Sequence, residues 1–304
     1  MRAVIYPNMD SAVEPLQELG YRAYHYTTLE KFRDIVQSQE LWLTNKESGS
    51  FTDEYELYYS YDNLQSDLNK LGKPYSEYLN GTDSDTIRKN MEKMKKALFI
   101  SCFSKTFKNR YLWKNYAGTS GVCIEFDIYR LQELMYVDGK SVAFFGDVNY
   151  ISDLNDASIL VKQAIDDPHI NHFSNPKEKA LIAWLRLFPF IKRTHSDIEN
   201  YESEMELRYV FNHLNYETLC KTTDLKVIEK IQEFKEETGL DGIFEYPLKH
   251  KRIKLSAMRN SENAFPFLKI YYNCKDDKSK ICQYLGVINP PEGFLEYIDV
   301  SKLD

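Results

Sequence analysis

The stretch from residue 21 to residue 44 carries both hydrophobic periods of protein secondary structure, and their order limits the folds open to the chain. Residues 21–26, YRAYHY, are rich in aromatic side chains and predict a strand. Thr27 and Glu30 have the spacing of a capping box at the start of a helix. Apolar side chains then recur at helical spacing at Leu29, Phe32, Ile35 and Val36. Because residues 41–44 predict another strand, the unit is strand, helix, strand.

The same mixture of strands and helices continues along the rest of the chain. Helical patterns cover residues 53–71, 83–96, most of 153–192 and 225–238. Strands are predicted at residues 98–103, 121–126 and 201–211, and the part from residue 247 onward mixes strands with loops. The sequence contains no repeat, low-complexity tract or linker. We therefore predict one α+β domain over residues 1–304 with helical insertions, in which residues 21–213 form the core and residues 214–304 a C-terminal helix and strand extension.

The charge balance is acidic, with 39 Lys and Arg against 46 Asp and Glu, for a net charge of −7. This balance argues against binding nucleic acid by bulk positive charge, although basic segments at residues 105–116 and 249–254 stand apart from it. The five cysteines form no Cys-x-x-Cys pair, and no stretch reaches the roughly 18 apolar residues of a membrane span. We therefore expect a cytoplasmic protein with no metal and no membrane partner.

Three charged residues in the alternating segment 201–211 form the first candidate site. Side chains alternate across a strand, so Glu204, Glu206 and Arg208 are expected to share one face. Two carboxylates this close repel each other, and a neighbouring arginine offsets the repulsion. A carboxylate held in this way can stabilise a developing cation or act as a base. The alternative is the solvated face of an edge strand.

The tripeptide His25-Tyr26-Thr27, where the first strand meets its helix, is the second candidate. A histidine that leaves a strand beside a cleft can bind a sugar hydroxyl or act as an acid or base. The alternative for His25 is a core histidine with satisfied hydrogen bonds, and capping alone accounts for Thr27.

Two further segments combine charge with aromatic side chains. Asp53 and Glu56 lie in FTDEYE, where carboxylates can bind a metal or, alternatively, complement a helix N-terminus. The other segment contains Lys105, Lys108, Arg110, Trp113 and Tyr116. Basic residues interleaved with aromatics suit phosphates and stacked bases, whereas a buried tryptophan among solvated lysines is the alternative. Cys102, for which the sequence supplies no paired base, is expected to be a small buried residue.

Four motifs occur in order over about two thirds of the chain, from Tyr24 to Phe211. They are YHYTTLEKFRDIVQSQELWLT, FTDEYE, FISCFSKTFKNRYLWKNYAGTSGVCIEFD and ESEMELRYVF. Together they resemble the motifs of the bacterial domain-of-unknown-function 2971 family, which has an aromatic-Tyr-[ST] strand, an FND loop, an SCFS strand with an LW-x-x-YA helix, and an ExExR strand. Thr52 stands where that family usually has Asn.

The order of these motifs also resembles that of ADP-ribosyltransferases, which have an early strand with a histidine and a late strand with a catalytic glutamate. The resemblance implies a central split sheet, mixed or antiparallel, and NAD as a substrate. Either Glu206 or Glu204 would carry the reacting carboxylate, and Tyr58 or Tyr59 would stack on nicotinamide. The residues implied for catalysis and NAD binding are His25, Tyr26, Thr27, Tyr58, Tyr59, Glu204, Glu206 and Arg208.

These features predict an NAD-dependent ADP-ribosyltransferase, either a toxin or an anti-phage defence effector, that modifies nucleic acid or protein. Acceptor binding is assigned to Lys105, Arg110, Trp113 and Tyr116, and a cognate antitoxin or chaperone protein is a further expected partner. One alternative is a metal-dependent nuclease that uses Asp53, Glu56, Glu204 and Glu206. Another is a non-catalytic interaction module whose aromatic side chains line a partner surface.

Overall fold

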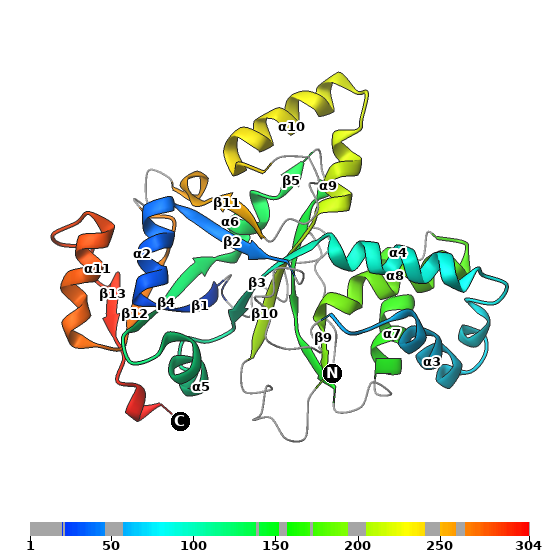
Figure 1. Cartoon of the computed structure of the whole chain (residues 1–304), viewed down its shortest axis with the longest axis horizontal. Coiled ribbons are helices and arrows are strands. Elements are labelled where there is room, and N and C mark those ends of the chain that lie inside the picture. Colours follow the sequence, from blue (N-terminus) through cyan, green and yellow to red (C-terminus); the bar gives the residue numbers. More distant parts are fainter. Residues whose placement is uncertain are drawn as a thin grey trace.

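A twisted sheet of nine strands runs through the middle of the described part of the chain (Figure 1). The computed structural model describes Gly20 and residues 22–45, 57–137, 140–151, 157–170, 173–193, 205–240, 250–259 and 265–303. The strands of this sheet are β1 Arg22–Thr28, β2 Glu40–Thr44, β3 Leu98–Ser104, β4 Gly121–Asp127, β7 Ala143–Asp147, β10 Glu206–Asn212, β11 His250–Lys254, β12 Lys269–Tyr272 and β13 Leu295–Tyr297. Their order is β11-β2-β3-β1-β4-β12-β13, and β10 and β7 continue the sheet from β3.

The sheet divides at β3, which has different neighbours at its two ends. Strand β10 pairs with β3 along one edge, from Glu206↔Ser104 to Asn212↔Leu98. The other edge is shared, because β1 pairs at Tyr24↔Ser104 and β2 pairs at Thr44↔Ile100. The sheet is therefore split between β1 and β2. The β12–β13 pair is parallel and the other pairs of this sheet are antiparallel. Together with the helices, this mixed sheet confirms the predicted α+β class.

Helices cover both faces of the sheet (Figure 1). One layer contains α2 (Leu29–Ser38) and α11 (Lys278–Leu285), whose Phe32 and Ile281 belong to the largest apolar cluster. Side chains of α10 (Leu225–Thr238) complete that cluster. A second apolar cluster joins the other face to α3 (Tyr61–Leu71), α4 (Ser84–Lys96), α7 (Ser158–Ile165) and α8 (Pro176–Leu187). The shorter helices are α5 (Arg110–Leu112), α6 (Ile128–Glu133) and α9 (His213–Cys220).

Two small two-stranded sheets lie beside the main one in the described residues. They are formed by β5 (Tyr136–Val137) with β6 (Lys140–Ser141), and by β8 (Asn149–Ile151) with β9 (Ile191–Arg193). The second of these is parallel and pairs Tyr150 with Lys192, 42 positions later in the chain. This pairing contributes to the candidate site.

The capping box predicted at Thr27 is wrong by one residue. Thr28 is the N-cap of α2, and its hydroxyl accepts a hydrogen bond from the backbone N–H of Lys31 at 3.3 Å. Thr27 instead continues β1, where it is buried and paired with Val122 of β4. Both threonines are paired with β4, but the helix begins at Leu29, so the side chain that reaches the first turn is that of Thr28.

Other helix ends agree with local sequence signals. The α4 helix follows an Asp83 cap, and α10 ends at Gly239, which adopts the left-handed conformation with φ +74°. The described part of the tyrosine-rich stretch is helical only from Tyr61, after the capping residue Ser60. Residues 53–56, where that helix was expected to begin, lie outside the described residues. The predicted C-terminal extension supplies β11, β12 and β13 to the main sheet. It also contains α11, a helix that was not predicted from the sequence.

Alternation along the strands divides their side chains between two faces with different character. The first, which we call the core face, joins the cluster beneath α2 and includes Ala23, Phe103, Ile124, Leu207 and Tyr209. The second, which we call the polar face, carries polar or ionisable side chains at the centre of the sheet. These are Tyr24, Tyr26, Cys102, Ser104, Glu125, Glu206 and Arg208.

Candidate functional site

A row of polar side chains crosses the polar face from β4 to β10. Strand register places Glu125 opposite Tyr24, Tyr24 opposite Ser104, and Ser104 opposite Glu206. All four side chains are buried, in a chain whose buried residues are mostly apolar. Because buried carboxylates require compensating partners, the two ends of the row show how each charge is held.

Glu206 lies at the start of β10 and is surrounded by donors. Its Oε1 accepts a hydrogen bond from Nε of Arg208 at 2.8 Å, and its Oε2 accepts one from the hydroxyl of Tyr150 at 3.1 Å. The ammonium of Lys192 lies 3.6 Å from the same Oε2. Tyr150 and Lys192 come from β8 and β9, so the small parallel sheet brings both to the carboxylate. Arg208 also donates to the carbonyl of Pro189 at 2.6 Å.

This environment keeps Glu206 ionised. Burial acts to raise the pKa of the carboxyl, but the charges of Arg208 and Lys192 and the hydrogen bonds outweigh it and lower the pKa to about 2. The predicted pairing of Glu206 with Arg208 on one strand face is present in the structure.

Backbone strain occurs next to this carboxylate. Met205 adopts a φ of +48°, which is unfavourable for a side chain of its size, and its carbonyl accepts a hydrogen bond from the backbone N–H of Lys105 at 3.1 Å. The other described non-glycine residues with positive φ are Gln39 and Leu57. Strained backbone of this kind is concentrated at functional sites, so the conformation of Met205 favours a functional site at the start of β10.

Cys102 is exposed, contrary to the expectation that it is buried. It lies on β3 opposite Arg208, and the residues on either side of it along the strand are buried. A hydrogen bond from its side chain helps to lower the pKa of Glu206. The apolar layers over the polar face therefore leave the sheet open to solvent at Cys102, directly beside the Glu206 carboxylate.

His25 takes part in a different contact. Its Nδ1 lies 3.0 Å from the carbonyl oxygen of Cys102, and because a carbonyl only accepts, Nδ1 carries the proton. The ring packs 5.6 Å from Phe103, a residue of the core face. Burial lowers the pKa of His25, since desolvation disfavours the imidazolium. His25 is thus a neutral side chain at the fork between β1 and β2, on the face opposite to Glu206. The structure does not bring together these two residues, which the sequence interpretation placed in one catalytic site.

Tyr26 ties β1 to the basic and aromatic segment that follows β3. Its hydroxyl donates to the carbonyl of Thr106 at 2.8 Å and accepts from the backbone N–H of Asn109 at 3.1 Å. Tyr26 packs edge-to-face against Trp113, with ring centroids 5.3 Å apart. Burial raises the pKa of Tyr26 far above its ordinary value. Tyr26 therefore has a structural role in positioning this segment.

Trp113 begins a turn of π-helix, Trp113–Ala117, in which Gly118 N–H donates to the carbonyl of Trp113 five residues back. The indole of Trp113 is fully buried and donates to the carbonyl of Phe107 at 2.8 Å. The expectation that Trp113 stacks on an acceptor base is therefore wrong, because its faces are covered by protein. Tyr116 is 48% exposed and Arg110 is exposed as well, so these two remain available to an acceptor.

The tyrosines proposed for nicotinamide stacking have different environments. Tyr59 is fully buried in the second apolar cluster and donates to Asp67 at 2.6 Å, which excludes it as a stacking surface. Tyr58 is exposed. Lys105 is paired with Asp147 of β7 at 2.7 Å, close to the start of β10. Glu204, Asp53 and Glu56 lie outside the described residues.

Glu125 is the polar-face residue that the sequence interpretation missed. It is buried in β4, accepts a hydrogen bond from the hydroxyl of Tyr271 at 2.6 Å and pairs with Arg22 at 3.1 Å. A glutamate inside the apolar run GVCIEFD is a signal that could have identified it. Tyr150 and Lys192 carry no such signal, since they reach Glu206 only through the pairing of β8 with β9.

The chemistry open to this arrangement centres on the Glu206 carboxylate. Among the described residues, no group of three or more His, Cys, Asp and Glu side chains is placed to hold a metal ion. An ionised and immobilised carboxylate beside an opening to solvent can stabilise a cationic transition state.

Comparison of the chain with family models, with curated proteins and with solved structures finds no match. Within the described residues, no helix is both long and apolar enough to cross a membrane. None of the five cysteines, all of which the structure describes, takes part in a disulfide. The α+β fold and the buried ion cluster of the polar face are therefore the observations from which a function can be argued.

Proposed function

We propose that the protein is an NAD-dependent ADP-ribosyltransferase in which Glu206 is the carboxylate at the reacting carbon. The observation that carries the proposal is the position of this ionised side chain, on a late strand of a split sheet and beside the exposed Cys102. The order of sequence motifs gives independent support, since it places an early histidine strand before a late glutamate strand.

The chemistry needs a negative charge where the sugar becomes cationic. The bond between C1′ of the ribose and the ring nitrogen of nicotinamide breaks, and both electrons of that bond leave with nicotinamide. The acceptor nucleophile then forms a bond to C1′, and its proton passes to solvent. A fixed carboxylate lowers the energy of the cationic sugar, as in glycoside cleavage.

Glu206 suits the electrostatic part of this reaction. With a pKa of about 2 it is a weak proton acceptor near neutral pH, so its proposed role is to stabilise charge and not to act as the general base. Arg208 and Lys192, which hold the carboxylate in place, are proposed to lie on the side of the site that takes the anionic pyrophosphate of NAD.

The other residues take roles consistent with their places in the structure. His25 is proposed as a positioning residue, because its Nδ1 is bonded to β3 and its ring lies on the core face. Tyr58 is the exposed tyrosine available to nicotinamide, and Arg110 and Tyr116 are exposed for a nucleic-acid or protein acceptor. A toxin or anti-phage effector with a cognate antitoxin or chaperone remains the proposed biological setting.

The test is transfer of label from NAD, carrying the label on its ADP-ribose part, to macromolecules of a bacterial extract. The informative variant is Glu206→Asp, which keeps the negative charge beside Arg208 and Lys192 but withdraws the carboxylate by one methylene. We expect at least a tenfold loss of transfer with retained folding. Glu125→Gln is the matched control, since it alters a buried carboxylate in the same row, and it should retain activity in proportion to the folded fraction.

Absence of label transfer by the folded wild-type protein would overturn the proposal, as would equal transfer by Glu206→Asp. Magnesium-dependent cleavage of RNA or DNA without NAD would instead favour the nuclease. Partner binding that survives loss of His25, Glu204 and Glu206, with no turnover, would favour an interaction module.

A further inference from the structure

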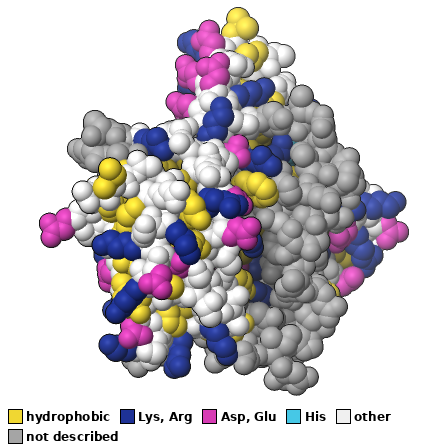
Figure 2. Space-filling model, turned by 60° about the vertical axis from the view of Figure 1, so that its left-hand side comes forward, with side chains coloured by type: hydrophobic (Ala, Val, Ile, Leu, Met, Phe, Trp, Pro, Cys, Tyr) yellow, Lys and Arg dark blue, Asp and Glu magenta, His cyan; other side chains and the backbone are white. Residues whose placement is uncertain are grey.

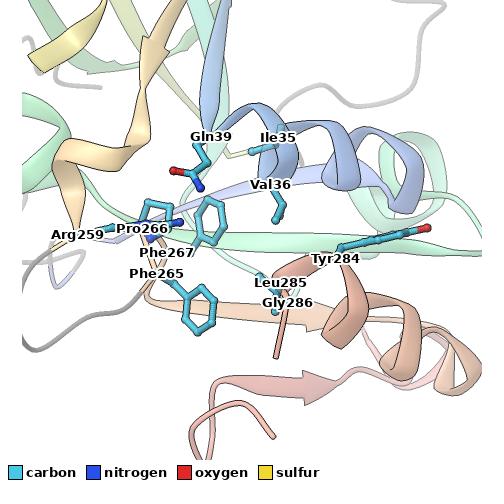
Figure 3. Close-up of a pocket in the computed structure, with 10 residues that line it drawn as sticks. All are labelled: Ile35, Val36, Gln39, Arg259, Phe265, Pro266, Phe267, Tyr284, Leu285 and Gly286. Carbon is cyan, nitrogen blue, oxygen red and sulfur yellow. The ribbon is translucent and has the colours of Figure 1, made fainter. Parts of the chain in front are cut away.

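A cavity of about 140 Å³ lies on the core-face side of the molecule, where α2 and α11 end (Figure 3). Ile35, Val36 and Gln39 line it from α2 and its C-cap, and Tyr284, Leu285 and Gly286 line it from α11 and its C-cap. The remaining walls come from Arg259 and from residues 265–267. The polar face, with Glu206, lies on the opposite side of the sheet.

Most of the cavity wall is apolar and partly aromatic. In Figure 3, Ile35 and Val36 project from α2 on one side, and the rings of Phe265 and Phe267 stand opposite. Phe267 is fixed by its packing against Phe32 and Phe126 of the core, with ring centroids 6.4 Å and 5.4 Å away. The wall is therefore preformed, because its central ring belongs to the packed core.

The polar groups are few and have one sign of charge. Arg259 supplies a guanidinium and Gln39 an amide to the lining, and the lining residues that the structure describes include no carboxylate. Within the described part of the chain, the Arg259 guanidinium makes no ion pair. Gln39 is held at the end of α2 in the left-handed conformation, with φ +54°, and its carbonyl accepts from Leu255 N–H at 2.7 Å. The side-chain amide of Gln39 faces the cavity (Figure 3).

Charge on this side of the molecule is mixed. Figure 2, which brings the side with α11 and α2 forward, shows Lys and Arg scattered among Asp and Glu, with hydrophobic side chains between them. The surface therefore offers no broad electrostatic attraction here, and selectivity has to come from the cavity itself.

We propose that this cavity binds a small monocarboxylate with an aromatic or branched apolar body. The apolar body would lie between Val36, Leu285 and the two phenylalanine rings, and the carboxylate would meet Arg259 and the Gln39 amide. A cavity of about 150 Å³ is large enough for benzene, so a phenyl-sized body matches the volume here. A guanidinium recognises carboxylates in two-point geometry, which gives the site its preference for an anion.

Sodium phenylacetate is the probe, and binding to the full chain is measured by calorimetry and by saturation-transfer NMR. We expect saturable binding of phenylacetate, with phenylacetamide and acetate each at least tenfold weaker, because one lacks the charge and the other the apolar body. The assay contains no NAD, so its outcome is independent of the proposed transferase activity.

Three variants assign the binding to this cavity. Arg259→Gln should weaken phenylacetate at least tenfold while leaving phenylacetamide unchanged, and Arg259→Lys should retain part of the affinity. Val36→Trp, at a half-buried position of the lining, should fill the cavity and abolish binding of both compounds. Arg252→Gln is the matched control, since this arginine stacks on Trp42 away from the cavity and its loss should leave the affinity unchanged.

Equal affinity for phenylacetate and phenylacetamide would overturn the assignment of a carboxylate site. Equal binding by wild type and Val36→Trp, with the fold of the variant checked by circular dichroism, would place the ligand elsewhere and overturn the site as well. Failure of phenylacetate to saturate would overturn the proposal as a whole.

Discussion

His25 and Glu206 lie on opposite faces of the sheet, and Cys102 connects them. The carbonyl of Cys102 accepts the hydrogen bond from Nδ1 of His25, and the side chain of Cys102 hydrogen-bonds with Glu206. The two ionisable groups most expected to share a cleft are thus separated by the thickness of one strand. His25 can therefore affect a reaction at Glu206 by holding β3 in place. Variants of His25 and of Glu206 can be studied separately, because the two side chains lie on different faces.

The first prediction concerns the acid stability contributed by Glu206. Its pKa is lowered from 4.5 to about 2 on folding, so its contribution is complete above pH 5 and is lost as the pH falls towards 2. The size is about 3 kcal/mol, at about 1.4 kcal/mol for each pH unit. Urea unfolding between pH 7 and pH 4 should show this loss begin in the wild type and be absent in Glu206→Gln.

Glu206→Gln also leaves Arg208 and Lys192 without their shared carboxylate, which should cost about 3–5 kcal/mol at pH 7. Glu77→Gln is the control, because Glu77 forms an exposed pair with Lys73 and should change stability by less than about 1 kcal/mol. The same pH slope in wild type and Glu206→Gln would contradict the prediction.

The second prediction concerns the protonation of His25. The pKa of His25 is lowered in the folded protein, so the unfolded chain takes up the proton first and stability falls as the pH drops below about 6.5. Nitrogen-detected NMR of the imidazole should show the neutral form with hydrogen on Nδ1 at pH 7. His25→Asn should remove this part of the pH dependence. Titration of His25 above pH 6.5, or hydrogen on Nε2 alone, would disprove the assignment.

The third prediction separates structure from binding in the basic and aromatic segment. Trp113 is fully buried, so Trp113→Ala should lower the free energy of unfolding by about 3–5 kcal/mol. Tyr116 is 48% exposed, and Tyr116→Ala should change it by less than about 0.5 kcal/mol. Both values follow from denaturant titrations. If Tyr116→Ala then weakens binding of an acceptor without changing stability, the segment contributes directly to recognition; a stable Trp113→Ala would refute the burial argument.

The fourth prediction tests the contact that joins β4 to the π-helical turn. A Cβ on Gly121 would lie 2.2 Å from the carbonyl oxygen of Ala117, which is backbone and has little room to move. A Cβ on Gly146 would meet the ring of Phe190 at 2.5 Å, and a side chain can shift more easily. Gly121→Ala should therefore lower the free energy of unfolding by about 1–3 kcal/mol, and by more than Gly146→Ala does, in thermal and urea unfolding. A larger loss for Gly146→Ala would contradict this prediction, because it would mean that the Ala117 backbone shifts more easily than the Phe190 ring.

Local patterns in the sequence determined several elements of this protein. The α10 helix coincides with its predicted range, the Asp83 cap begins α4, and Glu206 and Arg208 share one face of β10. Such features depend on residues close together in the chain, where helical or strand periodicity and capping act directly. The α+β class follows from them, because short strands and amphipathic helices alternate along the sequence.

The composition of the candidate site was decided by tertiary structure. Strand register places His25 on the core face, and the pairing of β8 with β9 brings Tyr150 and Lys192 to Glu206. The burial of Trp113 and the exposure of Cys102 likewise depend on which elements cover each strand. A shift of one residue in register reverses the face of every side chain on a strand. Pairing between distant segments sets that register, so periodicity within one strand cannot determine which side chains meet across the sheet.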